Sequence, residues 1–262
     1  MKLLTLQEIH ETELNILIDI DRFCRENGIR YSLDGGTLLG AIRHKGFIPW
    51  DDDIDIIMLR EDYERFIKSY HSEDGRYRLY NKDTTPAYRT QMFAKVIDTQ
   101  TIVDEGNYQQ QDAYGLWVDI FPADFVPARV RDCSRIQKKF LRYRHLLYVR
   151  NLQSGKRSLR DRIFSALYAC RSNMSVLNSL DHYAKKAGNS GRVSNLAMIS
   201  NRLIGFHFSA TLFDNLTETV FEGHRFFGFA EYDAYLTGLY GDYMTLPPVE
   251  KRVTHYVTAY RK

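Results

Sequence analysis

The sequence is poor in cysteine, proline and glycine, and it has no long apolar run. Its three isolated cysteines give neither an even set for a disulfide framework nor the paired spacing of a zinc site, so we expect them to be reduced. Six prolines and 16 glycines in 262 residues are too few for a collagen-like or low-complexity chain. No stretch reaches about 18 consecutive apolar residues, and this predicts that no helix spans a membrane.

The first residues do not read as a secretory signal. Gln7 and Glu8 interrupt the opening apolar residues, whereas a signal peptide needs a longer apolar stretch. We therefore expect a cytoplasmic protein. Hydrophobic residues make up 44% and charged residues 26%, as in ordinary folded chains, and the length allows one large domain or two small ones.

Charge is distributed unevenly, although the whole chain carries only +3. Residues 129–171 contain 13 Lys/Arg and two Asp/Glu, a net charge of +11, which leaves −8 for the other 219 residues. Apolar and aromatic side chains recur every three or four residues here, which predicts a basic amphipathic helical segment. We expect peripheral docking on an anionic membrane surface, with a solvated face as the alternative; without a nucleic-acid motif, we expect no nucleic-acid partner.

Hydrophobic periodicity predicts an α+β fold. Helices are expected over 9–24, 37–44, 62–70, 130–150, 159–170, 174–187 and 231–240. Strands are expected over 29–33, 54–58, 92–97, 116–121, 193–208 and 218–229, the last with a hairpin turn at 222–224. We divide the chain into a catalytic core over 1–128, a basic helical insertion over 129–190 and a C-terminal β/helix segment over 191–262, within one compact unit.

The densest chemical signal is the acidic cluster at 51–55. Asp53 and Asp55 lie two residues apart at the head of an apolar strand, so strand alternation places both carboxylates on one face. Ile54 and Ile56 then point into the core on the opposite face. Two carboxylates on one face need a cation, and oxygen ligands suit Mg²⁺ or Mn²⁺. We therefore predict a metal site here, with a chance acidic cluster as the alternative.

A Gly-Gly turn and a third carboxylate complete the candidate site. Gly35, Gly36 and Thr37 follow a strand and open a helix, where free N–H groups favour a phosphate; an ordinary turn is the alternative. Asp119 is a lone charge in the apolar strand 116–121, which is costly unless it coordinates a metal or pairs with an Arg. Its less constrained competitors are Asp98, Asp104 and Glu105. Together these features predict metal-assisted phosphate transfer.

Two long motifs, 33–43 (LDGGTLLGAIR) and 46–55 (GFIPWDDDID), resemble the LicD family of phosphocholine transferases, to which the fukutin-related proteins belong. The resemblance continues at 118–122 (VDIFP), Tyr235-Leu236, 240–244 (YGDYM), Pro247-Pro248 and His255. It implies a nucleotidyltransferase-type mixed β-sheet core with flanking helices. Asp53, Asp55 and Asp119 match the three carboxylates of that fold.

The resemblance also implies the reaction. A phospho-alcohol such as phosphocholine would move from a CDP-activated donor to a hydroxyl of a cell-surface glycan or its lipid-linked precursor, and CMP would leave. Asp53 and Asp55 would hold Mg²⁺, while Asp119 would either complete the metal shell or act as general base. The expected substrate-binding residues are Gly35, Gly36, Thr37, Arg43, Lys95, Tyr240, Tyr243 and His255.

For the substrate-binding residues outside the Gly-Gly turn, a purely structural role is the alternative to ligand binding. Arg43 grips a phosphate or forms a surface ion pair, and Lys95 binds phosphate or lies on an exposed strand face. Tyr240 and Tyr243 wall a pocket suited to a choline-like cation, or belong to a C-terminal segment that covers the core. His255 contacts a phosphate or is a surface histidine.

Two other functions fit the same residues. One is a nucleotidyltransferase that keeps the nucleotide on its product and releases pyrophosphate. The other is a catalytically silent nucleotide-binding protein, against which the intact Asp53, Asp55 and Asp119 argue. The alcohol, the acceptor sugar and the oligomeric state are not encoded in any motif that we recognise.

Overall fold

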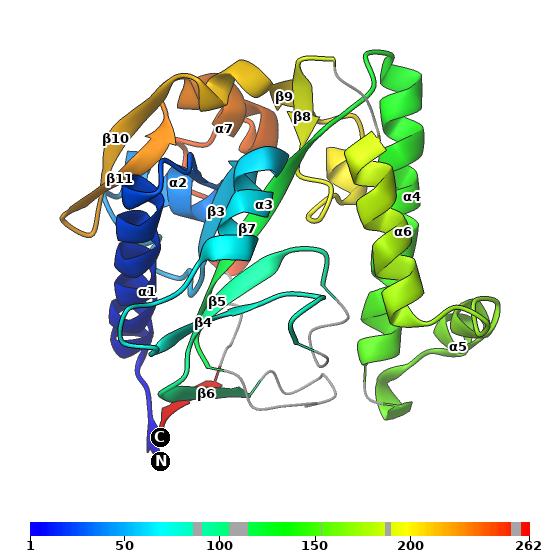
Figure 1. Cartoon of the computed structure of the whole chain (residues 1–262), viewed down its shortest axis with the longest axis horizontal. Helices are drawn as coiled ribbons and strands as arrows, with labels where there is room; N and C mark the ends of the chain where they lie inside the picture. The colour runs from blue at the N-terminus through cyan, green and yellow to red at the C-terminus, as the bar shows by residue number, and fades with distance from the viewer. Residues whose placement is uncertain (86–90, 105–114, 153, 187–189, 253–257) are drawn as a thin grey trace.

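The computed structural model describes residues 1–85, 91–104, 115–152, 154–186, 190–252 and 258–262, which form an α+β fold around a mixed sheet. The main strand order is β2-β3-β7-β5-β4 (Figure 1). These strands are β2 (Ser32–Leu33), β3 (Ile54–Leu59), β7 (Trp117–Phe125), β5 (Ala94–Asp98) and β4 (Tyr77–Tyr80). β3 and β7 run parallel while the other neighbours are antiparallel, so the predicted α+β class with a mixed sheet is confirmed.

Smaller strands extend this core. β8 (Arg192–Ser194) pairs with the end of β7 and with β9 (Phe208–Ser209). β1 (Lys2–Leu3), β12 (Thr258–Arg261) and β6 (Thr101–Asp104) form a separate sheet, which brings the two ends of the chain side by side. β10 (Leu216–Phe221) and β11 (His224–Phe229) form the predicted hairpin. Glu222 and Gly223 both have positive φ, as a two-residue hairpin turn requires.

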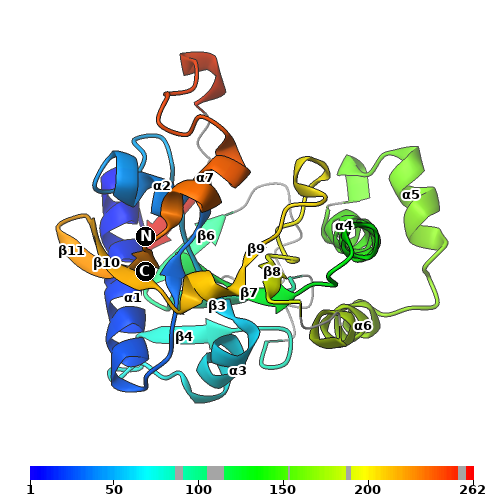
Figure 2. The same ribbon diagram turned by 90° about the horizontal axis from the view of Figure 1, so that it is seen from above.

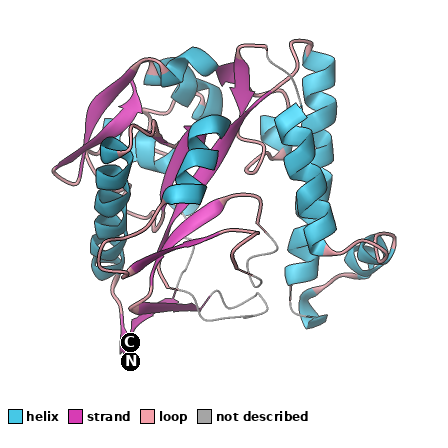
Figure 3. Ribbon diagram, viewed as in Figure 1, coloured by secondary structure: helices cyan, strands magenta, loops and turns pink. Residues whose placement is uncertain are grey.

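The helices fall into two groups, which Figure 3 separates clearly from the strands. α1 (Leu6–Glu26), α2 (Gly35–Arg43), α3 (Arg60–Ser69) and α7 (Tyr232–Tyr240) lie around the central sheet. α4 (Val130–Asn151), α5 (Leu159–Ala166) and α6 (Asn173–Lys186) stand together on one side of it. Within the described ranges, no helix is both long enough and apolar enough to cross a membrane.

The local sequence explains why α1 begins and ends where it does. Thr5 and Glu8 form a reciprocal capping box at its start, and Gly28 follows its end with φ of 58°. The predicted apolar stripe is fully buried at Ile16 and Ile20, in the same cluster as the strand residues of the main core. This cluster packs α1 against the sheet. The packing also sets the positions of the polar side chains of α1 relative to the sheet.

The basic segment has a hydrophobic core of its own. Buried side chains of α4 and α6, such as Phe140, Leu147, Leu177 and Leu180, form a cluster separate from the main one. The amphipathic pattern predicted for this segment is therefore real. The apolar side of α4 packs against α6 and against Leu196 and Ile199, which leaves its other side for charged residues.

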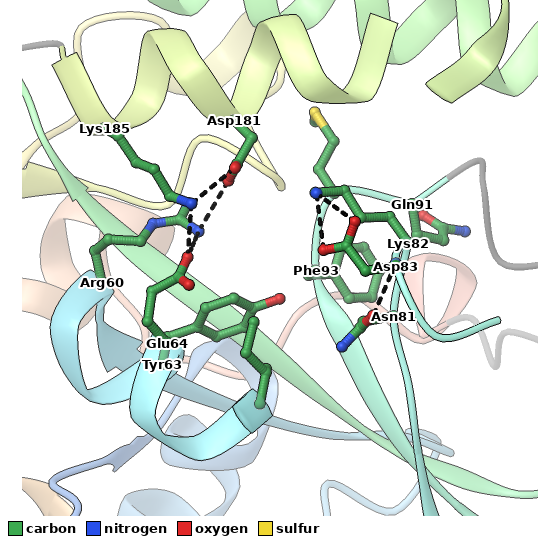
Figure 4. Close-up of a pocket in the computed structure, with 12 residues that line it drawn as sticks. Arg60, Tyr63, Glu64, Asn81, Lys82, Asp83, Gln91, Phe93, Asp181 and Lys185 are labelled. Carbon is green, nitrogen blue, oxygen red and sulfur yellow. Dashed lines mark hydrogen bonds and ion pairs between the residues drawn. The ribbon is translucent and has the colours of Figure 1, made fainter. Parts of the chain in front are cut away.

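Ion pairs tie the insertion to the central sheet. Arg60 of α3 contacts Asp124 of β7 at 2.7 Å and Asp181 of α6 at 3.4 Å. Figure 4 shows Arg60 and Asp181 beside a small cavity of ≈ 60 Å³, where Lys185 also bridges Asp181 and Glu64. The charged side chains that line this cavity form ion pairs with one another. We therefore assign the cavity a structural role, in which these pairs hold α6 against α3.

Two predicted elements were wrong in extent. The strand expected over 193–208 consists only of β8 and β9, because Leu196 and Ile199 turn into the core of the insertion instead of pairing. The helix expected over 159–170 ends as α5 at Ala166. Periodicity also did not reveal the short strands β1, β4, β6 and β12, which pair with partners far away in the sequence.

Candidate active site

Three ionisable side chains lie in a row across the central sheet. Asp55 on β3 is directly opposite Asp119 on β7, and Asp119 is directly opposite Lys95 on β5. Directly opposed residues project from the same face, and neighbouring strands lie roughly 4.8 Å apart. Ile54 and Ile56 are fully buried, as the alternation argument predicted. The sheet therefore places Asp55, Asp119 and Lys95 on one face.

Lys95 is the partner of Asp119. Its Nζ lies 3.0 Å from Asp119 Oδ1 and 3.6 Å from the centre of the Trp117 ring. Lys95 is only 4% exposed, so the alternative of an exposed strand face is wrong. The lone charge of Asp119 is indeed paired, but with a lysine and not with an arginine. Burial raises the pKa of Asp119 to about 6, although Lys95 opposes this shift.

Negative charge is concentrated around Asp55. Burial, followed by the nearby carboxylates of Asp53 and Asp119, raises the pKa of Asp55 well above its ordinary value. Asp53 lies immediately before β3, which begins at Ile54. Of the competing acids, Asp98 is bound by Arg76 at 2.7 Å, and Asp104 lies on β6 in the separate small sheet. Glu105 lies outside the described residues.

The Gly-Gly turn lies against this carboxylate cluster. Gly35 has φ of 51°, and a Cβ there would lie 3.6 Å from Asp55 Oδ2 and 3.5 Å from the hydroxyl oxygen of Tyr240. The Thr37 hydroxyl accepts a hydrogen bond of 2.9 Å from the Asp55 backbone N–H. Gly35, Thr37 and Tyr240 are thus brought to the head of β3. The turn and the head of the acidic strand therefore lie side by side.

Asp34 anchors the turn, although it was not among the predicted site residues. Its carboxylate caps α2 by accepting from the Gly35 N–H at 2.8 Å. It also accepts from the hydroxyl of Tyr235 on α7 and from Asn195 Nδ2. Burial raises the pKa of Asp34, and these three donors oppose the rise. The C-terminal segment thereby holds the turn in place.

Glu13 of α1 is a further carboxylate that the sequence analysis missed. It is 2% exposed, and its Oε2 has no hydrogen-bond partner among the described residues. Burial and the charges of Asp53 and Asp119 raise its pKa well above the ordinary value. One helical turn earlier, His10 Nε2 donates to the Asp51 carbonyl at 2.7 Å. A signal existed, because Glu13 falls on the apolar stripe of α1.

The other predicted ligands that the structure describes have partners outside the carboxylate cluster. Arg43 donates to the Tyr243 carbonyl, and burial lowers its pKa. Tyr243 is buried with its hydroxyl bound to Asp233 at 2.7 Å, which favours the covering role over a pocket wall. His255 lies outside the described residues. Of the aromatic candidates, Tyr240 alone is placed by these contacts beside the turn.

The donor set has the charge and the chemistry of a divalent-cation site. Hard carboxylate oxygens suit Mg²⁺ or Mn²⁺, and the buried Glu13 oxygen without a hydrogen-bond partner points to a missing positive charge. In the described part of the chain, no three Asp, Glu, His or Cys side chains are arranged as a metal group. Asp119 is turned toward Lys95. Asp53 and Asp55 are therefore the residues that fit an ion best.

Gly36→Ala tests the close approach at the turn. A Cβ at Gly36 would lie 2.6 Å from Asp51 Oδ2, so the carboxylate must move. We expect activity to fall about tenfold, since small misplacements at a reacting centre are costly, while the melting temperature changes little. Gly155→Ala is the matched control because nothing lies near its Cβ position. Unchanged activity in Gly36→Ala would show that the turn does not position the site.

Comparison with known proteins identifies the family. The chain is 33% identical over 98% of its length to the lipopolysaccharide cholinephosphotransferase LicD of Haemophilus influenzae, and it covers 98% of that protein. The chain belongs to the LicD family. A family model described as "LicD/FKTN/FKRP, nucleotidyltransferase domain" matches residues 28–154, which include the turn, Asp53, Asp55 and Asp119. The predicted family is confirmed, and so is the prediction of a LicD-type phosphotransferase enzyme.

A second similarity within the LicD family is shorter. The ribitol 5-phosphate transferases FKRP of mouse and human are each 57% identical to this chain over 35 residues. That stretch covers 13% of this chain and 7% of each relative. The names of these relatives give two different alcohols, choline and ribitol, so family membership leaves the alcohol open.

Proposed function

We propose that this LicD-family enzyme transfers a phospho-alcohol, phosphocholine or a close analogue, from a CDP-activated donor to a glycan hydroxyl and releases CMP. The observation that carries this proposal is the row of Asp55, Asp119 and Lys95 beside the Gly-Gly turn. A relative that matches nearly the whole chain is named a lipopolysaccharide cholinephosphotransferase, which supports this substrate class. The core would then be of nucleotidyltransferase type.

The turn and the carboxylates have different roles in binding the donor. Gly35 and Gly36 allow the pyrophosphate to approach the backbone at the start of α2, where N–H groups favour negative charge. Asp53 and Asp55 would hold Mg²⁺, which would neutralise charge developing on the departing CMP phosphate. The buried hydrogen bond between Asp34 and Tyr235 ties the turn to α7, and the Asp34 N–H donates to the Asp55 carbonyl of β3 at 2.9 Å.

In this mechanism Asp119 is the general base, which takes the proton of the attacking hydroxyl. Its pKa of about 6 lies near the working pH, which suits a general base, and its tie to Lys95 favours this role over metal ligation. Once Asp119 is protonated, the Lys95 charge would remain beside the reacting phosphate as a phosphate ligand. The activity should therefore fall as the pH drops below about 6.

The direct test is CMP release from a panel of CDP-alcohols with purified enzyme and a saccharide acceptor, first with Mg²⁺ and then with EDTA. We expect metal-dependent CMP release from one donor, which would also identify the alcohol. Pyrophosphate release from CTP would instead show a nucleotidyltransferase. Donor binding without any turnover, detected as a thermal shift, would show a silent binding protein.

The acceptor would be a cell-surface glycan or its lipid-linked precursor. We propose that transfer takes place on the cytoplasmic side of a membrane, with the basic segment 129–171 in peripheral contact with anionic lipid. The +11 charge of this segment supports such a contact, and no nucleic-acid motif accompanies it.

A further inference from the structure

α5 exposes an apolar stripe at the edge of the molecule. Leu159, Ile163 and Leu167 are 73%, 56% and 72% exposed, and they lie four residues apart. None of the eight residues of α5, all of them described, is buried. Figure 2 shows α5 projecting beyond α4 and α6, on the side away from the central sheet. A helix is rarely left with an unused apolar face of this kind.

An arginine-lined hollow adjoins this stripe. It is broad and open, with a volume of ≈ 490 Å³, and Arg150, Arg157, Arg162 and Arg171 line it. Arg150 donates to the carbonyls of Tyr168 and Arg171, and Arg157 donates to those of Arg150 and Leu152. These acceptors are uncharged. In the described part of the chain, none of the four arginines forms an ion pair with a carboxylate.

The stripe and the hollow lie on neighbouring faces of α5. Arg162 and Ala166 are four residues apart and both line the hollow, whereas Leu159 and Ile163 belong to the stripe. Burial and the charge of Arg171 lower the pKa of Arg150, so the hollow is a place of concentrated positive charge. Apolar residues beside uncompensated arginines match the acyl boundary and the phosphates of an anionic bilayer.

We propose that α5 and the arginine hollow form a peripheral membrane contact. Leu159, Ile163 and Leu167 enter the boundary between headgroups and acyl chains, and the hollow receives the phosphate of an anionic phospholipid. The inference rests on the proposed function for its purpose, which is to bring the enzyme to a lipid-linked acceptor. The contact itself requires no donor and no turnover. The proposed membrane contact is thus confined to α5 and the adjoining hollow and does not extend along the whole basic segment.

The test is co-sedimentation of the full chain with vesicles of equimolar phosphatidylcholine and phosphatidylglycerol, compared with vesicles of phosphatidylcholine alone. The wild-type protein should bind the anionic vesicles. Leu159→Ser with Ile163→Ser should weaken binding at least about tenfold, because the apolar area no longer enters the bilayer. Arg157→Gln with Arg162→Gln should weaken it roughly fivefold for each charge removed. Both pairs should leave CMP release from a soluble donor unchanged.

Arg131→Gln with Lys138→Gln is the control for charge alone. Both side chains are exposed on the first half of α4, and Arg131 and Lys138 lie about 18 to 28 Å along the helix from Arg150. We expect a much smaller loss of vesicle binding from this pair. Equal losses from the control and from the hollow variant would overturn the proposal, because attraction would then come from net charge.

Three other results would also overturn it. Binding that survives the serine variant but not the Arg157/Arg162 variant would make the hollow a site for a soluble phosphate. A wild-type dimer that the serine variant converts to a monomer would mean that a second copy covers the stripe. Failure of wild type to bind anionic vesicles would remove the contact altogether, whereas absent CMP release with intact vesicle binding would contradict only the proposed chemistry.

Discussion

Asp55→Asn is expected to lower phosphotransfer by at least about 100- to 1000-fold, because it removes a carboxylate that would hold the metal ion, and with that ion the positive charge that would stabilise the departing phosphate in the transition state. Asp53→Asn should act in the same direction. Both replacements keep the shape of the side chain, so the protein should stay folded. Asp214→Asn, at an exposed aspartate that pairs with Arg30 and lies outside the sequence motifs, is the matched control and should retain full activity.

The same substitution should not destabilise the metal-free protein. Folding raises the pKa of Asp55 above its value in the unfolded chain. The protonated carboxyl is therefore tolerated in the folded state at a pH below the unfolded-state pKa, and this stability is lost as the pH rises through the folded-state pKa. At neutral pH in EDTA, Asp55→Asn should therefore melt at the same temperature as wild type or higher. Mg²⁺ should raise the melting temperature of wild type and have little effect on the variant. Near-normal activity of the variant would contradict the metal assignment.

Lys95→Met is expected to lower the free energy of unfolding by about 3 kcal/mol at neutral pH, since it leaves a buried carboxylate unpaired. Lys95 and Asp119 are 4% and 9% exposed, so water cannot readily take the place of the lost partner. The substitution also removes the cation from the face of Trp117. Urea unfolding measures the loss directly, and phosphotransfer should disappear with it.

The double variant Lys95→Met with Asp119→Asn separates stability from chemistry. The neutral amide no longer needs a positive partner, so most of the lost stability should return. Activity should not return, because both the general base and its partner are gone. If Lys95→Met alone costs less than roughly 1 kcal/mol, as an exposed ion pair would, the buried pair does not organise the site.

Local patterns were sufficient to predict the acidic strand and the turn. Alternation placed Asp55 on the polar face and buried Ile54, and this argument needs only the residues of one strand. The position of Lys95 opposite Asp119 was beyond such reasoning, because it depends on the register between β5 and β7. Register between strands distant in sequence is set by the whole core and not by the strands themselves.

Contacts between distant segments account for most of what was missed at the site. Tyr235 reaches Asp34 from 201 residues away, and neither residue carries a local signal of that contact. Glu13 differs, since its place on the apolar stripe of α1 marks it as a buried charge that needs an explanation. The overlong strand at 193–208 failed because Leu196 and Ile199 pack into the helical insertion, where burial overrides β-propensity.

The most direct measurement is the mass of the acceptor after reaction, taken together with the identity of the released nucleotide. The enzyme would be incubated with Mg²⁺, one CDP-alcohol and a lipopolysaccharide-type saccharide. We predict that the acceptor gains one phospho-alcohol for each CMP released, and that Asp55→Asn yields neither product. An acceptor that gains a nucleotide, or CMP release that is equally fast with Asp55→Asn, would contradict the transfer reaction assigned to this site.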